Sequence, residues 1–156
     1  MTNRLYAIEI DERGLARPTP EIDQERRVAI FDLLEGNSFA LPRAAEFPGP
    51  YRLGIAIRDG RLVFAIANEP GRKVAEFHLS MGPFRQVVKD YFQICESYFE
   101  AVKRLPPARI EVIDMARRGI HNEGARVLQE RLAGKAVVDD DTARRLFTLI
   151  CVLHWG

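Results

Sequence analysis

The sequence predicts an α+β fold in which an antiparallel sheet from the first half of the chain packs against helices from the second half. Two observations lead to this prediction. Apolar residues recur at every second position between residues 51 and 80, as in strands, and at every third or fourth position after residue 82, as in helices. The 156 residues are 47% hydrophobic and 29% charged, which is typical of one globular domain with its own core. We expect a single domain over 1–156, with a sheet-forming part over 1–80 and a helical part over 83–155.

The first two elements are a strand and a helix. Residues 4–10 alternate apolar and polar side chains, which indicates a strand. A helix is expected over residues 20–35, because Thr19 is a good N-cap and Gly36 a good C-terminal stop. The residues expected to face inward from this helix are Ile30, Leu33 and Leu34.

A loop and a hairpin meander follow. Residues 37–50 contain three prolines and show no periodicity, so we expect a loop. Asp59 and Gly60 form a two-residue hairpin signal between two alternating segments. The meander strands are expected over 53–57, 62–66 and 74–79, with a turn at 69–71. The sheet thus has three strands, or four if residues 4–10 add to one edge.

The helical half begins at Pro83. A stripe of apolar residues runs along residues 83–105 with helical spacing, and Pro106 and Pro107 end that helix. The stripe consists of Phe84, Val88, Tyr91, Cys95, Tyr98, Val102 and Leu105.

The segment GIHNEG, residues 119–124, has two interpretations. In one, Gly119 ends a helix over 108–118 and Asn122 caps a second helix over 123–133. In the other, one helix continues through both glycines, each costing about 1 kcal/mol relative to alanine. The apolar rhythm favours continuity and the capping residues favour a break; we favour the break.

The last helix opens with three aspartates, Asp139 to Asp141, which suit a helix N-terminus. From Leu146 to Leu153 only Thr148 is polar, so this helix is expected to lie in the core or to pair with its copy in a homodimer. Its apolar run of about ten residues is too short for a membrane span, which needs about twenty.

Charge and targeting signals narrow the class of protein. The net charge of +1 gives no overall field that would attract nucleic acid or acidic membrane, so neither is an expected partner. The N-terminal residues lack an apolar run of signal-peptide length, which favours a cytoplasmic protein. Cys95 and Cys151 lie in apolar helical patterns and are expected to be two buried thiols.

No motif for a metal, a cofactor or a covalent nucleophile is present. The histidines His78, His121 and His154 have no metal-ligand spacing to one another or to a cysteine. No phosphate-binding glycine loop or serine elbow occurs either. We therefore predict neither a metal nor a cofactor.

Four long blocks carry a resemblance over nearly the whole chain. They are AIFDLLEGNSF, PFRQVVKDYFQICESYFEAV, MARRGIHNEGARVLQERLAGK and DTARRLFTLICVLHWG. They resemble the defining blocks of an uncharacterised family of small alphaproteobacterial proteins. The resemblance implies a bacterial, soluble, single-domain protein, and it implies no activity, ligand or catalytic residue.

The candidate site is the cluster Arg117, Arg118, His121, Asn122 and Glu123. The functional hypothesis makes His121 a general acid or base and Glu123 a second carboxylate, while the arginines hold an anionic group. The alternative is a capped turn with a surface network of ion pairs, and we favour it because one histidine beside a pair of glycines is weak evidence for a catalytic site.

Paired arginines form a second constellation. Each pair lies on a predicted helix, so one member can flank the core while the other meets solvent or an acid. If these residues converged they would bind RNA, a nucleotide or a phosphorylated metabolite. The set is Arg26, Arg27, Arg117, Arg118, Arg144 and Arg145, with Arg85 and Lys89.

Taken together, these patterns favour a non-enzymatic binding or regulatory module that acts through a protein or a small anionic partner. The alternatives are a small enzyme that uses His121 and Glu123, and an RNA- or nucleotide-binding protein that uses the paired arginines. An enzyme requires these side chains to converge in a concave pocket.

Overall fold

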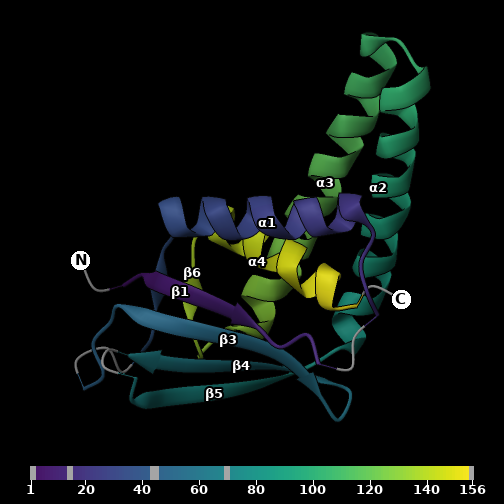
Figure 1. Ribbon diagram of the computed structural model, residues 1–156. Helices are drawn as coiled ribbons and strands as arrows, with labels where there is room; N and C mark the ends of the chain where they lie inside the picture. The colour runs from purple at the N-terminus through teal and green to yellow at the C-terminus, as the bar shows by residue number, and fades with distance from the viewer. Residues whose placement is uncertain (1–2, 14–15, 43–45, 69–70, 155–156) are drawn as a thin grey trace.

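A four-stranded sheet lies beneath a layer of helices in the computed structural model, which describes residues 3–13, 16–42, 46–68 and 71–154 (Figure 1). The α+β prediction is confirmed. In chain order the elements are β1 Leu5–Ile10, α1 Pro20–Glu35, β2 Phe39–Ala40, β3 Tyr51–Arg58, β4 Arg61–Asn68, β5 Lys73–Ser80, the 3-10 helix η1 Gly82–Phe84, α2 Arg85–Arg104, α3 Pro107–Arg131, β6 Val137–Val138 and α4 Asp140–Leu153.

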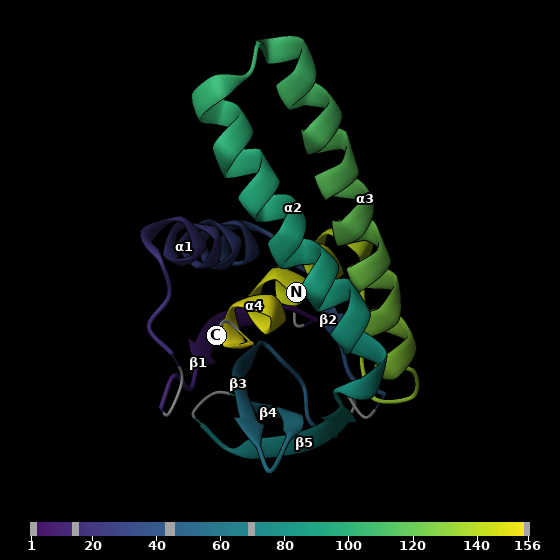
Figure 2. The same ribbon diagram turned by 90° about the vertical axis from the view of Figure 1, so that its right-hand side faces the viewer.

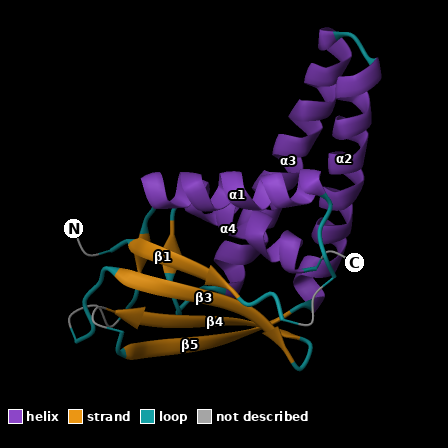
Figure 3. Ribbon diagram, in the orientation of Figure 1, coloured by secondary structure: helices purple, strands orange, loops and turns teal. Residues whose placement is uncertain are grey.

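The main sheet has the strand order β1-β3-β4-β5, and β3 to β5 form the expected antiparallel meander (Figure 3). Asp59 and Gly60 connect β3 to β4 with φ angles of 52° and 73°. Two consecutive residues with positive φ make the type I′ turn that the Asp-Gly pair favours. Of the second predicted turn, residues 69 and 70 lie outside the described ranges.

Strand β1 adds to the free edge of β3, as expected, but it runs parallel to it. The reason is the connection. Helix α1 lies between the two strands in the sequence, and a helical crossover returns the chain to the same end of the sheet, whereas the antiparallel arrangement arises from short hairpins. The sheet is therefore mixed, with one parallel pair.

The segment predicted as a loop over 37–50 contains regular structure at its start. Phe39 and Ala40 form β2, which pairs antiparallel with β6 from the second half of the chain. The Asn37 side chain pairs with the backbone of β1 as a neighbouring strand would. Its Oδ1 accepts from the Leu5 amide at 2.7 Å, and its Nδ2 donates to the Leu5 carbonyl at 2.9 Å. These long-range pairings have no local signal in the sequence.

Helix α1 begins as predicted, with Thr19 Oγ1 accepting from the Ile22 amide at 3.3 Å. Its buried face contains Ile22, Ala29 and Leu33, but Leu34 is 42% exposed, so the prediction that Leu34 faces inward was wrong. The helix packs on α4 with one side only, and its other side faces solvent (Figure 1). Because this contact is narrow, α1 buries fewer of its apolar side chains than its sequence suggests.

Helices α2 and α3 form an antiparallel hairpin that projects far beyond the rest of the molecule (Figures 1 and 2). The apolar stripe of α2 is buried at Val88, Tyr91 and Cys95, close to the sheet and α4. Toward the tip its burial is lost, and Val102 is 53% exposed. The predicted stripe is thus a core face in its first half only, because toward the tip α2 has only α3 beside it (Figures 1 and 2).

Helix α3 runs without interruption through residues 119–124, so the favoured break is wrong. Gly119 lies in open space, where a Cβ would meet no atom within 4 Å. Gly124 faces α4, and a Cβ there would lie 2.5 Å from ring atoms of Phe147. Gly124 therefore permits close packing of α3 on α4 rather than ending a helix, and Asn122 is inside the helix rather than at a cap.

Helix α4 lies between α1 and the sheet, and every residue from Leu146 to Leu153 is buried (Figure 2). Asp139 caps it by accepting from the Thr142 amide at 2.9 Å. The prediction of a core helix is confirmed, and the homodimer stays a prediction. Cys95 and Cys151 are both buried free thiols, as expected. Within the described residues, no helix combines the length and apolar character that crossing a membrane requires.

Candidate anion-binding cavity

A cavity of about 400 Å³, the His121 cavity, lies where α1, α3 and α4 meet. Figure 2 shows α1 on one side and the α2–α3 hairpin on the other, with α4 between them. The floor comes from α4, one wall from α1 and the other from α3. The lining residues are Glu25, Val28, Ala29 and Asp32 of α1, Arg118, His121 and Asn122 of α3, and Arg144, Arg145 and Thr148 of α4.

Three of the predicted arginines meet at this cavity. Arg118 forms an ion pair with Asp114 at 2.9 Å, and its side chain remains 76% exposed. Arg144 pairs with Asp141, the acid one helical turn before it. Arg145 donates a long hydrogen bond of 3.4 Å to the Gly36 carbonyl and has no carboxylate partner within the described part of the chain. Two arginine pairs that are distant in sequence thus contribute to one site.

His121 forms part of the α3 wall, and its ring is held from several sides. Its Nδ1 is 3.0 Å from the carbonyl oxygen of Arg117, one helical turn earlier. The ring makes edge contacts with Tyr91 and Phe147, with centroids 5.3 Å and 6.3 Å away. Burial lowers the pKa of His121, and the positive charges of Arg117 and Arg144 lower it further. The imidazole is therefore neutral near pH 7.

Arg117 supports the site from behind rather than lining it. It pairs with Glu25 at 2.5 Å, linking α3 to α1, and its guanidinium carbon lies 4.8 Å from the ring centroid of Tyr98. Burial raises the pKa of Glu25, while the charge of Arg117 opposes that rise. Arg117 is thus a structural ion pair and ring contact, consistent with the prediction that one arginine of each pair flanks the core.

Glu123 and Asn122 are placed differently from each other. The structure does not bring Glu123 to the cavity. Its carboxylate pairs with Arg126 at 2.5 Å, and the hydrogen bond from Arg126 lowers the pKa of Glu123. Asn122 does line the cavity, where its Oδ1 accepts from Arg144 at 3.2 Å. Because consecutive helical residues point about 100° apart, His121 and Glu123 face in different directions on the uninterrupted α3.

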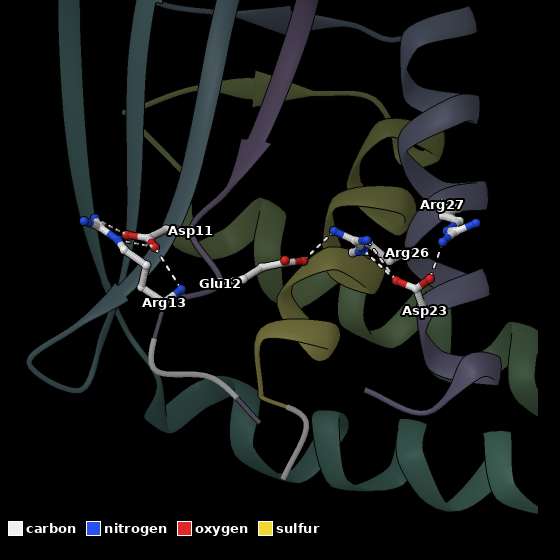
Figure 4. A network of polar contacts seen from close by, with 6 residues as sticks. All are labelled: Asp11, Glu12, Arg13, Asp23, Arg26 and Arg27. Atoms are coloured by element: carbon white, nitrogen blue, oxygen red, sulfur yellow. Dashed lines mark hydrogen bonds and ion pairs between the residues drawn. The ribbon is translucent and has the colours of Figure 1, made fainter. Parts of the chain in front are cut away.

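The remaining basic residues lie elsewhere. Arg85 and Lys89 line a separate cavity that also contains His154. Figure 4 shows Arg26 between the carboxylates of Glu12 and Asp23, with Arg27 on the other oxygen of Asp23. These four arginine and lysine side chains do not join the His121 cavity, so the predicted constellation converges only in part.

Neither a metal site nor an activated thiol is found among the residues that the structure describes. Among residues 3–13, 16–42, 46–68 and 71–154, no three histidine, cysteine or acidic side chains gather closely enough to hold a metal ion. Burial raises the pKa of the Cys95 thiol to about 11, so near pH 7 it is protonated and a poor nucleophile.

Comparison with known proteins identifies the family. The model of the uncharacterised protein family UPF0262 matches residues 2–156. The chain belongs to the UPF0262 family. Its similar relatives include a UPF0262 protein of Cereibacter sphaeroides ATCC 17029, 75% identical over 157 residues, and one of Ruegeria pomeroyi, 71% identical over 157 residues. The first alignment covers 99% of both chains, and the second covers 99% of this chain and 98% of the relative. No solved structure matches.

Sequence reasoning missed part of the site in this UPF0262 chain. Glu25 and Asp32 lie on α1 among many other polar residues, and Thr148 was noted only as the polar exception in an apolar helix. Their role depends on the packing of α1 and α3 across α4. A useful signal was available for Thr148 alone, since one polar residue in an otherwise apolar helix needs a hydrogen-bond partner or a cavity.

Proposed function

We propose that this protein is a non-enzymatic binding module that holds a small anionic molecule in the His121 cavity. The observation that supports this most is the meeting of Arg118, Arg144 and Arg145 at one cavity, with Arg145 lacking a carboxylate partner in the described ranges. A guanidinium group donates two parallel hydrogen bonds to a carboxylate or a phosphate, which makes arginine well suited to such ligands.

The arginines that are already paired can turn to a ligand at little cost. The pair between Arg118 and Asp114 is largely exposed on the arginine side, and Arg144 pairs with an exposed Asp141. Exposed ion pairs contribute only about 0–1 kcal/mol to stability. Exchanging such a partner for a ligand anion in a concave site therefore loses little folding free energy.

The size and the apolar wall of the cavity fit a small molecule. Its volume of about 400 Å³ is at the lower end of the range of small-ligand pockets, about 300–1,000 Å³. Val28 and Ala29 form an apolar wall on α1 opposite the polar α3 side. A compact ligand with an anionic group and a short carbon skeleton would use both surfaces.

The two alternative functions have less support from the geometry. The enzyme hypothesis needed His121 and Glu123 together, and Glu123 is paired with Arg126 away from the cavity. The RNA hypothesis needed a continuous basic surface, and Arg85 lies at a different cavity while Arg26 is neutralised by carboxylates.

Isothermal titration calorimetry of the whole chain with L-malate and with inorganic phosphate tests the proposal. We expect binding at low ionic strength that weakens as salt is added, because the contacts are electrostatic. Arg145→Gln removes one charge-assisted contact, worth about 1.5–3 kcal/mol, and should weaken binding by about tenfold or more. The matched control is Arg85→Gln, which removes the same charge outside the cavity and should leave affinity unchanged.

Two results would overturn the proposal. One is the absence of heat for both anions in the wild-type chain. The other is an equal loss of affinity in the Arg145 and Arg85 variants, which would show that net charge rather than the cavity determines binding.

A further inference from the structure

The proton on His121 is placed by its hydrogen bond. A backbone carbonyl only accepts, so the 3.0 Å contact between Nδ1 and the Arg117 oxygen requires the proton on Nδ1. In the neutral ring the other nitrogen, Nε2, then carries a lone pair and is an acceptor. Nε2 has no hydrogen-bond partner in the part of the chain that the structure describes, and His121 lines the cavity.

Two more acceptors line the same cavity. Thr148 Oγ1 donates its proton to the Arg144 carbonyl at 3.3 Å, so only its lone pairs remain for a ligand. The Asp32 carboxylate lines the α1 wall and makes neither a hydrogen bond nor an ion pair within the described residues. Unpaired acceptors in a partly buried site favour a ligand that brings donors of its own.

We infer that the ligand is an anion whose carbon skeleton also carries a hydroxyl group, either a hydroxycarboxylate or a polyol phosphate. This inference rests on the proposed anion-binding function. The arginines contact the carboxylate or phosphate, and His121 Nε2, Thr148 Oγ1 and Asp32 accept from the hydroxyl side. The ring contacts with Tyr91 and Phe147 hold the imidazole in orientation, so Nε2 is a fixed acceptor.

Matched ligand pairs test this inference by calorimetry. L-Malate and succinate have the same charge and differ by one hydroxyl. Glycerol 3-phosphate and propyl phosphate form the matching phosphate pair, which differs by two hydroxyls. We expect the hydroxylated member to bind about tenfold or more tightly, because a site built for a hydroxyl leaves acceptors unpaired when it is missing. The carboxylate and phosphate arms show which anionic group the arginines prefer.

Substitutions of the acceptor residues test whether these acceptors cause the preference for the hydroxylated ligand. His121→Phe keeps a planar ring between Tyr91 and Phe147 but removes Nε2, so the preference for malate over succinate should shrink several-fold while succinate still binds. Thr148→Val removes a second acceptor with a similar shape. His154→Phe is the control, because His154 has the same contact from Nδ1 to a carbonyl, at 2.6 Å to Ile150, but lies outside this cavity.

The outcomes separate the two proposals. Equal affinity for both members of each pair, or an unchanged preference in His121→Phe and Thr148→Val, would overturn the hydroxyl inference and leave the anion-binding function standing. Failure of every member of both pairs to bind would overturn the proposed function itself. Circular dichroism of each variant establishes that it is folded before the affinities are compared.

Discussion

At the scale of single residues, Gly119 and Gly124 of α3 show that the neighbour of a glycine decides what the glycine does for stability. Gly119 and Gly124 look alike in the sequence, and α3 runs through both of them. The first faces open space, while the second faces the buried ring of Phe147. Their identical residue type therefore has opposite consequences for stability.

Alanine substitutions at these two positions should change stability in opposite directions. Gly119→Ala should raise the free energy of unfolding by about 0.5–1 kcal/mol, because alanine favours a helix and meets no neighbour. Gly124→Ala should lower it by about 1–3 kcal/mol, because the new Cβ overlaps Phe147. Urea denaturation of both variants measures this, and a loss of similar size in both would contradict the assigned packing.

The histidines His121 and His154 are residues whose protonation links stability to pH. Burial lowers the pKa of each in the folded state, whereas in the unfolded chain it returns to about 6.5. Below about pH 6.5 the unfolded chain binds more protons than the folded one. The stability that these neutral rings contribute is therefore present above about pH 6.5 and is lost as the pH falls.

Denaturation at about pH 7.5 and about pH 5.5 checks this linkage. We expect the wild-type chain to be less stable at the lower pH and the double variant His121→Phe/His154→Phe to lose less stability over the same interval. His78→Gln is the control, because His78 is exposed on β5 and lies outside the core. An equal loss in the wild type and the double variant would contradict the assignment to these two histidines.

At the scale of elements, the sequence predicted those that depend on local signals. Thr19 and Asp139 cap helices as expected, and Asp59-Gly60 forms the hairpin turn. What it did not predict depends on contacts between distant segments. Strand β2 forms only because β6 lies beside it, and the first half of α2 is buried while its second half projects.

Helix α3 shows the same limit most clearly. Its apolar rhythm indicated continuity, and its glycines and asparagine indicated a break. The apolar rhythm indicated the helix correctly, because α3 packs on α2 and α4 and buries Gly124, Ala125 and Leu128. Residue propensity was the weaker signal here because close packing on Phe147 explains Gly124.

At the scale of the whole molecule, the candidate site depends on three helices meeting. The proximity of Arg117, Arg118, His121 and Asn122 could be predicted, because these residues share one short segment. The sequence could not place Arg144 and Arg145 beside them, or Asp32 opposite, since those positions follow from the packing of α1 and α3 across α4. Glu123 points away from the cavity because α3 is continuous and places residues two positions apart on different sides, whereas the favoured helix break gave no such separation.

The central claim is that an anion binds at the arginines of this cavity, and nitrogen-15 NMR of the arginine side chains tests it most directly. Titration of the labelled chain with L-malate should shift the Nε–Hε signals of Arg145, Arg144 and Arg118, assigned by single Arg→Lys variants. The signals of Arg85 and Arg26 should stay in place, because these side chains lie outside the cavity. Shifts confined to Arg85 and Arg26, or no shift at the three cavity arginines at saturating malate, would contradict the account.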